Sequence, residues 1–172
     1  MSTTRAALLI AVALLAACAP DAPPTAPALA RGAAARRDHE LSSTQRRLER
    51  AADGLLYTSE SDHPFEFYLQ SAAISAPLTI ESFRAAVGVP ADSAVEATSL
   101  DAFFARHIEL ADPNDPVAQA LVPRFRHLRQ TVRTSVRDAR VFRVGRILIR
   151  CYVVGTDAGG NVVGLTTYAV ET

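Results

Sequence analysis

The sequence contains no lysine, no tryptophan and only two cysteines, Cys18 and Cys151, among its 172 residues. Two cysteines cannot build the multiple-disulfide framework on which many small secreted domains depend. Cys151 alternates with Ile147, Ile149 and Val153, so we expect a small buried apolar side chain without a disulfide partner. The fold must then be held by a hydrophobic core, for which a hydrophobic content of 49% is sufficient.

The usual signatures of catalysis and metal binding are missing as well. The chain has no glycine-rich phosphate loop, no metal-spaced cluster of cysteine and histidine, and no nucleophile elbow. Its four histidines are scattered along the sequence. We interpret His107, near an apolar helical face, as a hydrogen-bonded core histidine, and His63 as a residue with no serine or cysteine to activate. The sequence therefore predicts a protein that is not an enzyme and needs no cofactor or metal of its own.

The first 17 residues have the pattern of a signal peptide. A short basic stretch, Met1–Arg5, precedes an apolar run over residues 6–17 that is too short to span a bilayer. The run ends in Leu-Ala-Ala-Cys18, which resembles the lipobox of bacterial lipoproteins and implies cleavage before Cys18 and lipidation of its thiol. We expect a membrane-anchored protein of the bacterial cell envelope, on the outer membrane or facing the periplasm. An ordinary secretory signal is the alternative.

Three segments follow from this reading of the sequence. Residues 1–17 form the signal peptide, residues 18–40 the lipidated cysteine with an Ala/Pro/Arg-rich linker, and residues 41–172 one domain. Four prolines in the linker favour an extended, solvated tether.

The formal net charge of zero hides a strong asymmetry along the chain. Residues 51–123 carry eleven acidic residues against two arginines, a net charge of −9, whereas residues 124–150 carry nine arginines against one aspartate, a net charge of +8. We therefore expect one acidic and one basic face. A nucleic-acid-binding protein is usually basic throughout its surface, and this chain is not, so this class is not favoured.

Periodicity divides the remainder into helices and strands. We expect helices over about 43–55, 80–87, 100–108 and 116–136, and strands over about 65–70, 95–98, 147–155 and 162–170. Apolar character on both faces of the last strands indicates helices on both sides of the sheet. The pattern predicts an α+β protein with a largely antiparallel sheet of about four strands.

The fourth helix carries a stripe of arginines and an internal proline. Pro123 predicts a kink or two short helices. We interpret Arg126, Arg129, Arg133 and Arg137 as a solvated helix face and not as a phosphate-binding surface, because no aromatic residue interleaves with them.

The most informative stretch is an acidic loop between Gly54 and Tyr68. Glu60, Asp62 and Glu66 fall within seven residues without a base nearby, in the run Ser59-Glu60-Ser61-Asp62 and the aromatic strand that follows. Such a loop is costly to hold together unless it faces water, a metal ion or a basic partner. A capped turn between helix and strand is the alternative interpretation from the acids alone.

Three further segments belong with this loop. They are Val141–Gly145, Tyr152–Gly155 and the terminal Val170-Glu171-Thr172. Together with the loop, they resemble the nuclease A inhibitor family, small proteins that block a sugar-non-specific, magnesium-dependent endonuclease. The resemblance covers roughly residues 44–172 and implies a three-layer α/β/α sandwich.

The resemblance also implies which residues reach the enzyme. The loop acid and the C-terminal threonine are understood to approach the magnesium of the nuclease, and here they are Glu60 and Thr172. Thr172 brings a hydroxyl and, if the chain ends there, a terminal carboxylate. The flanking residues of the expected nuclease-binding site are Ser59, Ser61, Asp62 and Glu171.

The chain also departs from the family pattern. His63 occupies a position that commonly carries an aromatic residue, and the basic region and the expected lipid anchor are unusual for an inhibitor that acts inside its own cell. We therefore keep a second hypothesis, a cell-envelope binding or scaffold module that reuses the fold without inhibiting a nuclease.

Overall fold

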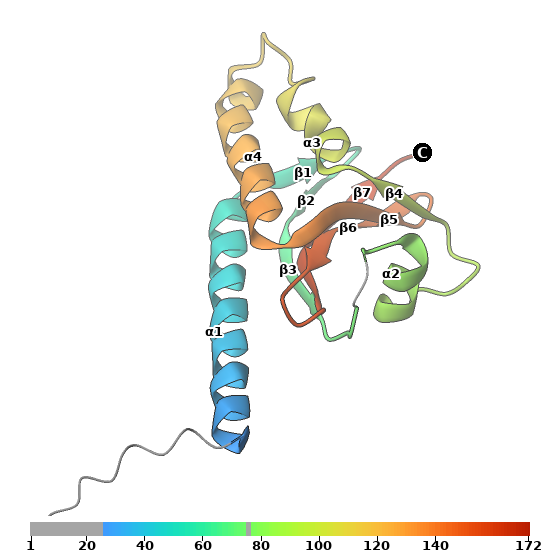
Figure 1. Cartoon of the computed structure of the whole chain (residues 1–172). Helices are drawn as coiled ribbons and strands as arrows, with labels where there is room; N and C mark the ends of the chain where they lie inside the picture. Colours follow the sequence, from blue (N-terminus) through green and yellow to red (C-terminus); the bar gives the residue numbers. More distant parts are fainter. Residues whose placement is uncertain (1–25, 75–76) are drawn as a thin grey trace, which may run out of the picture.

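The computed structural model describes residues 26–74 and 77–172 (Figure 1). The expected signal peptide and Cys18 lie outside these residues. The described helices are α1 (Ala26–Ala52), α2 (Ile80–Val87), α3 (Leu100–Ile108) and α4 (Pro116–Ser135). The described strands are β1 (Leu56–Thr58), β2 (Asp62–Pro64), β3 (Glu66–Gln70), β4 (Val95–Thr98), β5 (Arg137–Val144), β6 (Leu148–Thr156) and β7 (Val162–Val170).

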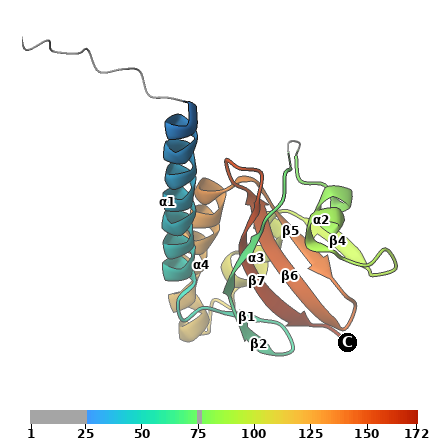
Figure 2. The same cartoon turned by 90° about the horizontal axis from the view of Figure 1, so that it is seen from below.

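Five of the strands form one sheet in the order β3-β7-β6-β5-β4, and each neighbouring pair is antiparallel. The last strand, β7, lies inside the sheet, between β6 and β3 (Figure 2). The sequence predicts about four strands; the additional one is β5, which the family resemblance places among the closing strands. The two short strands β1 and β2 form a separate antiparallel hairpin.

The two faces of the sheet are covered unequally. Helices α1, α3 and α4 pack on one face, against Cys151, Val153 and Leu165 among others. On the other face, Phe83 of α2 stacks on Phe142 of β5, with ring centroids 4.2 Å apart. The α+β class and the largely antiparallel sheet are thus confirmed. The full three-layer sandwich stays a prediction, because the second face carries a single helix of eight residues.

Helix α1 is longer than the sequence analysis predicts. It begins at Ala26, so residues 26–40 are helical and the expectation of an extended tether is wrong for this stretch. Alanine has the highest helix propensity, and Pro27 falls in the first turn, where its missing N–H has no intrahelical partner to lose. None of the described helices combines the length and the apolar content needed to cross a membrane.

Helix α4 is one continuous element. Pro123 lies within it without dividing it into two helices. The prediction of a solvated arginine face is wrong for Arg129, whose side chain is half-buried and lies 3.1 Å from Asp101 and 3.0 Å from Glu109. Arg133 is exposed as predicted, although it also lies 2.8 Å from Asp101. These ion pairs join α4 to α3, so the acidic and the basic regions of the sequence partly neutralise each other.

Gly164 lies where the backbones of β6 and β7 approach each other closely. A Cβ atom added at Gly164 of β7 would lie 2.1 Å from the carbonyl oxygen of Val153, which is backbone that cannot move without separating β6 from β7. We expect Gly164→Ala to lower the free energy of unfolding by about 1–3 kcal/mol, as overpacking does. Chemical denaturation of the purified protein measures this change.

The matched control is Gly32→Ala in α1. A Cβ atom there meets nothing within 4 Å. Alanine favours the helix over glycine, so stability should be unchanged or raised. Equal destabilisation by both substitutions would contradict the close approach of β6 and β7.

Candidate functional site

The β1–β2 hairpin lies along the outer edge of the last part of β7. Strand β3 pairs with residues 162–166 of β7 only, so the hydrogen-bonding edge beyond them needs another partner. The hairpin supplies it: the Thr167 hydroxyl donates to the carbonyl of His63 at 3.2 Å, and the Val170 N–H donates to the Ser59 hydroxyl at 2.9 Å. The hairpin tip, residues 59–61, is thereby held against the end of the chain.

Glu60 at the hairpin tip meets Thr172 directly. Its N–H donates to the carbonyl of Val170 at 3.3 Å, which places the side chain beside the tail. One carboxylate oxygen, Oε1, accepts from both the backbone N–H of Thr172, at 2.9 Å, and its hydroxyl, at 2.8 Å. The other oxygen, Oε2, has no hydrogen-bond partner within the described part of the chain. We call this arrangement the Glu60–Thr172 pair.

The pair is held in place and still faces solvent. Glu60 and Thr172 are both exposed. The two hydrogen bonds from Thr172, backbone first and hydroxyl second, lower the pKa of the Glu60 carboxyl from its ordinary value. The carboxylate is therefore ionised at neutral pH, with one oxygen fixed and the other open to a partner.

The neighbouring acid, Glu171, points to a different partner. Its Oε1 accepts from Arg143 of β5 at 2.5 Å, and its N–H donates to the carbonyl of Ile147 at 3.0 Å. Arg143 also lies 3.6 Å from Glu96 of β4. The hydrogen bond to Glu171 raises the pKa of the Arg143 guanidinium. Glu171 is thus occupied within the protein, and its ion pair fixes the tail one residue before Thr172.

Ser59 and Ser61 shape the hairpin tip from within. The Ser59 hydroxyl donates to the carbonyl of Ser61 at 3.2 Å, and the Ser59 N–H donates to the same oxygen at 3.0 Å. The Ser61 hydroxyl lies 2.8 Å from Nε2 of His63. The expectation that His63 has no serine beside it is therefore wrong. This contact closes the tip across the hairpin.

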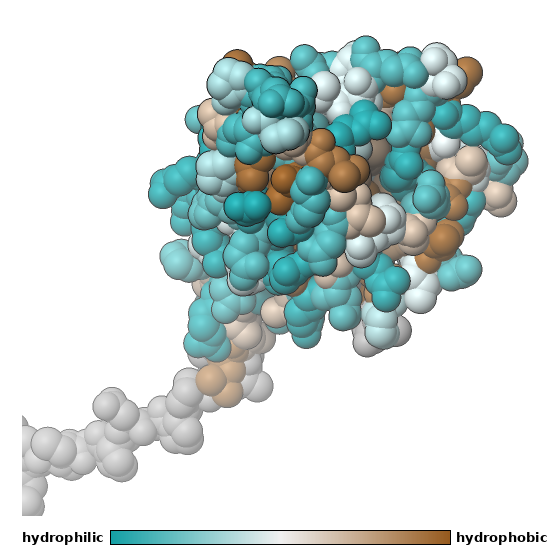
Figure 3. Space-filling model, turned by 90° about the horizontal axis from the view of Figure 1, so that it is seen from above, coloured by the Kyte–Doolittle hydropathy of each residue, from teal (hydrophilic) through white to brown (hydrophobic). Residues whose placement is uncertain are grey.

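Asp62 borders a feature that neither Glu60 nor Thr172 lines. It lines a cavity of about 420 Å³ between the hairpin, α3 and the start of α4, together with Arg106 and His107. Leu110 and Val117 line the same cavity and are 75% and 68% exposed. Figure 3, which views this end of the molecule, shows apolar surface surrounded by hydrophilic surface. Asp112 and Asp115 also line this cavity, so Asp62 borders a hollow with both apolar and acidic lining.

His107 is held by rings and not by the hydrogen bond that we expect for a core histidine. Its ring stacks on Phe125, with centroids 4.3 Å apart, and meets Tyr57 edge-on at 5.0 Å. Its Nε2 has no hydrogen-bond partner among the described residues. Burial, aided by Arg106 and opposed by Asp62, lowers the pKa of His107 to about 4. The imidazole is therefore neutral at physiological pH.

The site offers no metal centre or reactive thiol of its own within the described residues. No group of three or more histidine, cysteine, aspartate or glutamate side chains there is placed to hold a metal ion. Cys151 is fully buried, and burial raises the pKa of its thiol to about 11. The predicted small buried residue is confirmed. What the site can do chemically is present an oriented carboxylate to a cation.

A family model described as "Nuclease A inhibitor-like protein" matches residues 42–172. The chain belongs to this family. A search among curated proteins returned no match. The resemblance stated from the loop and the closing strands is thereby confirmed for the family. Membership of the nuclease A inhibitor-like family makes a nuclease the expected class of partner and a binding role the expected function.

Two features of this inhibitor-like site were not predicted from the sequence. The strands β1 and β2 are only three residues long, too short for an alternating pattern to reveal them. The ion pair of Arg143 with Glu171 joins residues 28 positions apart, and no local sequence pattern indicates it. The segment Val141–Gly145 contains Arg143, so the family resemblance marks its neighbourhood but not its partner.

The low pKa of Glu60 can be tested through Thr172. Thr172→Val removes the hydroxyl donor and keeps the N–H, so the pKa of Glu60 should rise towards its ordinary value of 4.5. Because the pKa is lowered in the folded state, the interaction stabilises the tail at neutral pH and is lost as the pH falls through that pKa. Carboxyl chemical shifts followed by NMR through an acid titration measure this.

Glu81 provides the internal reference. Its pKa is lowered by its own backbone N–H and by the Thr79 hydroxyl, far from the tail in sequence, and should not respond to Thr172→Val. Because the variant keeps the backbone N–H, we expect only part of the lowering to be lost; a pKa of Glu60 identical to that of the wild type would show that the threonine hydroxyl does not hold this carboxylate.

Proposed function

We propose that this protein is an inhibitor of a magnesium-dependent, sugar-non-specific endonuclease, and that the Glu60–Thr172 pair enters the active site of that enzyme. The observation that carries the proposal is the double hydrogen bond that fixes Oε1 of Glu60 and leaves Oε2 open at an exposed position. Family membership supports a nuclease as the partner.

The chemistry of such a nuclease suits a carboxylate. Its active site holds a hard cation and basic groups arranged for a phosphodiester, and magnesium prefers oxygen ligands. A carboxylate that occupies the place of the phosphate needs no catalytic machinery of its own. The inhibitor contributes the negative charge, and the enzyme supplies the metal.

The way the pair is held favours tight binding. Ordering a flexible side chain and a chain end on binding costs conformational entropy, which reduces affinity. Here the hairpin tip is tied to β7 through Ser59, and the tail is tied to β5 through Glu171. Much of that ordering is therefore already present in the free protein. Ser59, Ser61 and Glu171 act in this proposal mainly as residues that position Glu60 and Thr172.

The hollow beside the hairpin offers a second surface to the partner. Asp62 lies on its rim, and Leu110 and Val117 are exposed there. In the proposed complex, Asp62 meets the partner at this second point and does not add to the charge of the Glu60–Thr172 pair.

Inhibition by a soluble form, residues 19–172, tests the proposal. Glu60→Gln keeps an oxygen that can accept from Thr172 and removes only the negative charge. We expect an increase of the inhibition constant by at least about 30-fold, since a close desolvated charge contact is worth about 2–5 kcal/mol. Thr172→Val should raise the constant by about tenfold, because it removes one hydrogen bond to a charged group. Titration against a purified endonuclease of this class gives both values.

The matched control is Asp92→Asn, which changes the charge equally at an exposed position in the loop between α2 and β4. It should inhibit like the wild type. An unchanged inhibition constant for Glu60→Gln would refute the role of this carboxylate. Wild-type protein that does not inhibit any such nuclease at micromolar concentration would refute the function and leave the binding-module hypothesis.

The location of the inhibitor is a separate part of the proposal. We place it at the cell envelope, anchored through lipid on Cys18, on the strength of the lipobox-like sequence that ends at that residue. There it would meet nucleases that are exported or arrive from outside.

Lipidation has a direct chemical readout. Expressed with its leader in a bacterial host fed labelled palmitate, the wild-type chain should carry the label and sediment with membranes. Cys18→Ser should lose the label, whereas Cys151→Ala, at the buried cysteine, should keep it. Label retained in Cys18→Ser would exclude this anchor.

A further inference from the structure

A cavity of about 440 Å³ lies between α1 and α4, away from the Glu60–Thr172 pair. We call it the basic groove; it is lined by Ser43, Arg46, Arg47, Arg50, Ala51, His127, Thr131 and Thr134. Three arginines, one histidine and three hydroxyl side chains thus surround a hollow that no aspartate or glutamate lines. Every polar group in this set can donate a hydrogen bond, which suits an anion.

The arginines of the basic groove are not consumed by ion pairs within the described residues. Arg46 and Arg50 have no carboxylate within ion-pair distance there, and Arg47 donates to the Thr44 hydroxyl at 3.3 Å. By contrast, Arg129 and Arg143 are committed to acidic partners. The positive charge of the groove is therefore available to an external ligand.

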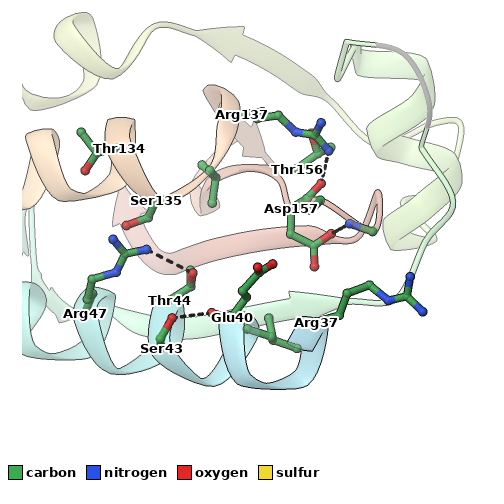
Figure 4. A pocket seen from close by; sticks show the side chains of 14 residues that line it. Arg37, Glu40, Ser43, Thr44, Arg47, Thr134, Ser135, Arg137, Thr156 and Asp157 are labelled. Atoms are coloured by element: carbon green, nitrogen blue, oxygen red, sulfur yellow. Dashed lines mark hydrogen bonds between the residues drawn. The ribbon is translucent and has the colours of Figure 1, made fainter. Parts of the chain in front are cut away.

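The adjoining cavity, shown in Figure 4, marks where the groove ends. It shares Ser43, Arg47 and Thr134 with the groove but adds two acidic residues, Glu40 and Asp157. The Asp157 carboxylate accepts from the backbone N–H groups of residues 159 and 161 and is satisfied by its own turn. The second cavity also adds Arg37 and Arg137, whose charge Glu40 and Asp157 offset. No acidic residue lines the groove itself, so the anion site is centred on Arg46, Arg47 and Arg50.

Two observations bear on the kind of anion. No phenylalanine, tyrosine or tryptophan lines the groove, and His127 is the one aromatic ring in its lining, so it offers little of the stacking surface with which proteins hold the bases of single-stranded nucleic acid. In addition, α1 runs from the groove to Ala26, only eight residues from the proposed lipid anchor at Cys18. The phosphates that lie closest to an anchored chain are those of the membrane itself.

We propose that the basic groove binds the phosphate groups of anionic membrane lipids. Arginine recognises phosphate through paired N–H donors, and basic residues near an anionic bilayer add to membrane affinity. Helices α1 and α4 lie on one side of the molecule and the chain end on the other in both views (Figures 1 and 2). A membrane held at the groove therefore leaves the Glu60–Thr172 pair facing away from the bilayer. This proposal stands independently of nuclease inhibition.

Vesicle binding by a chain that cannot be lipidated tests the groove. We would use residues 18–172 with Cys18→Ser, which retains the whole described fold, and vesicles of phosphatidylcholine with or without phosphatidylglycerol. Binding should require phosphatidylglycerol and weaken with salt. The triple variant Arg46→Gln, Arg47→Gln, Arg50→Gln should bind roughly 100-fold more weakly, about fivefold for each arginine.

The control variant carries Arg126→Gln, Arg140→Gln and Arg146→Gln. These arginines are exposed, have no ion pair within the described residues and lie outside the groove, so the change in net charge is the same. Its vesicle affinity should stay within a few-fold of the parent. An equal loss in both triple variants would overturn the proposal, because net charge and not the groove would then explain binding.

Two further measurements distinguish the source of the phosphate. Inorganic phosphate, compared with chloride at equal ionic strength, should compete only weakly with vesicles; saturable binding of free phosphate without vesicle binding would overturn the membrane assignment. Single-stranded DNA that binds through the groove while vesicles do not would overturn it in favour of nucleic acid.

Discussion

The position of β7 inside the sheet is the constraint on which the site depends. Because β7 pairs with β6 along its whole length, this pairing fixes the direction and the position of the chain end. Strand β3 covers only part of its other edge, and the hairpin tip completes it through Ser59. The hydrogen bond from the Glu60 N–H to the Val170 carbonyl then places the Glu60 carboxylate beside Thr172. Two segments 112 residues apart are thus joined by ordinary sheet pairing and one shared carboxylate oxygen.

The charged residues of the protein fall into groups with different roles. Some arginines of the basic region hold the molecule together: Arg129 joins α4 to α3, and Arg143 fixes the tail through Glu171. The arginines of α1 that line the groove, Arg46, Arg47 and Arg50, have no acidic partner within the described residues. Glu60 has no arginine partner in the part of the chain that the structure describes, and its hydrogen bonds to Thr172 lower its pKa. The near-zero net charge therefore conceals an exposed carboxylate beside the chain end and a groove lined by arginines on different sides of the fold.

Much of the fold could be predicted because its signals are local. Thr79 and Asp115 cap their helices as expected, and Gly88 ends α2 in the left-handed conformation. The hairpin β1–β2 and the start of α1 could not be predicted in this way. A strand of three residues is too short to show an alternating pattern. The prolines before α1 favour an extended chain, whereas the alanines within it favour a helix. The Glu60–Thr172 pair was predicted from the family resemblance. The ion pairs of Glu171 and Arg129 could not be predicted, because they join segments that are distant in the sequence. The same holds for the position of Asp62 beside the cavity.

The most direct measurement is a crystal structure of the protein bound to a magnesium-dependent nuclease that it inhibits. The account predicts Oε2 of Glu60 at about 2.0–2.1 Å from the magnesium of the enzyme, with Thr172 beside it and Oε1 still held by the tail. A complex in which the nuclease contacts another face, with the Glu60 side chain in solvent, would contradict it.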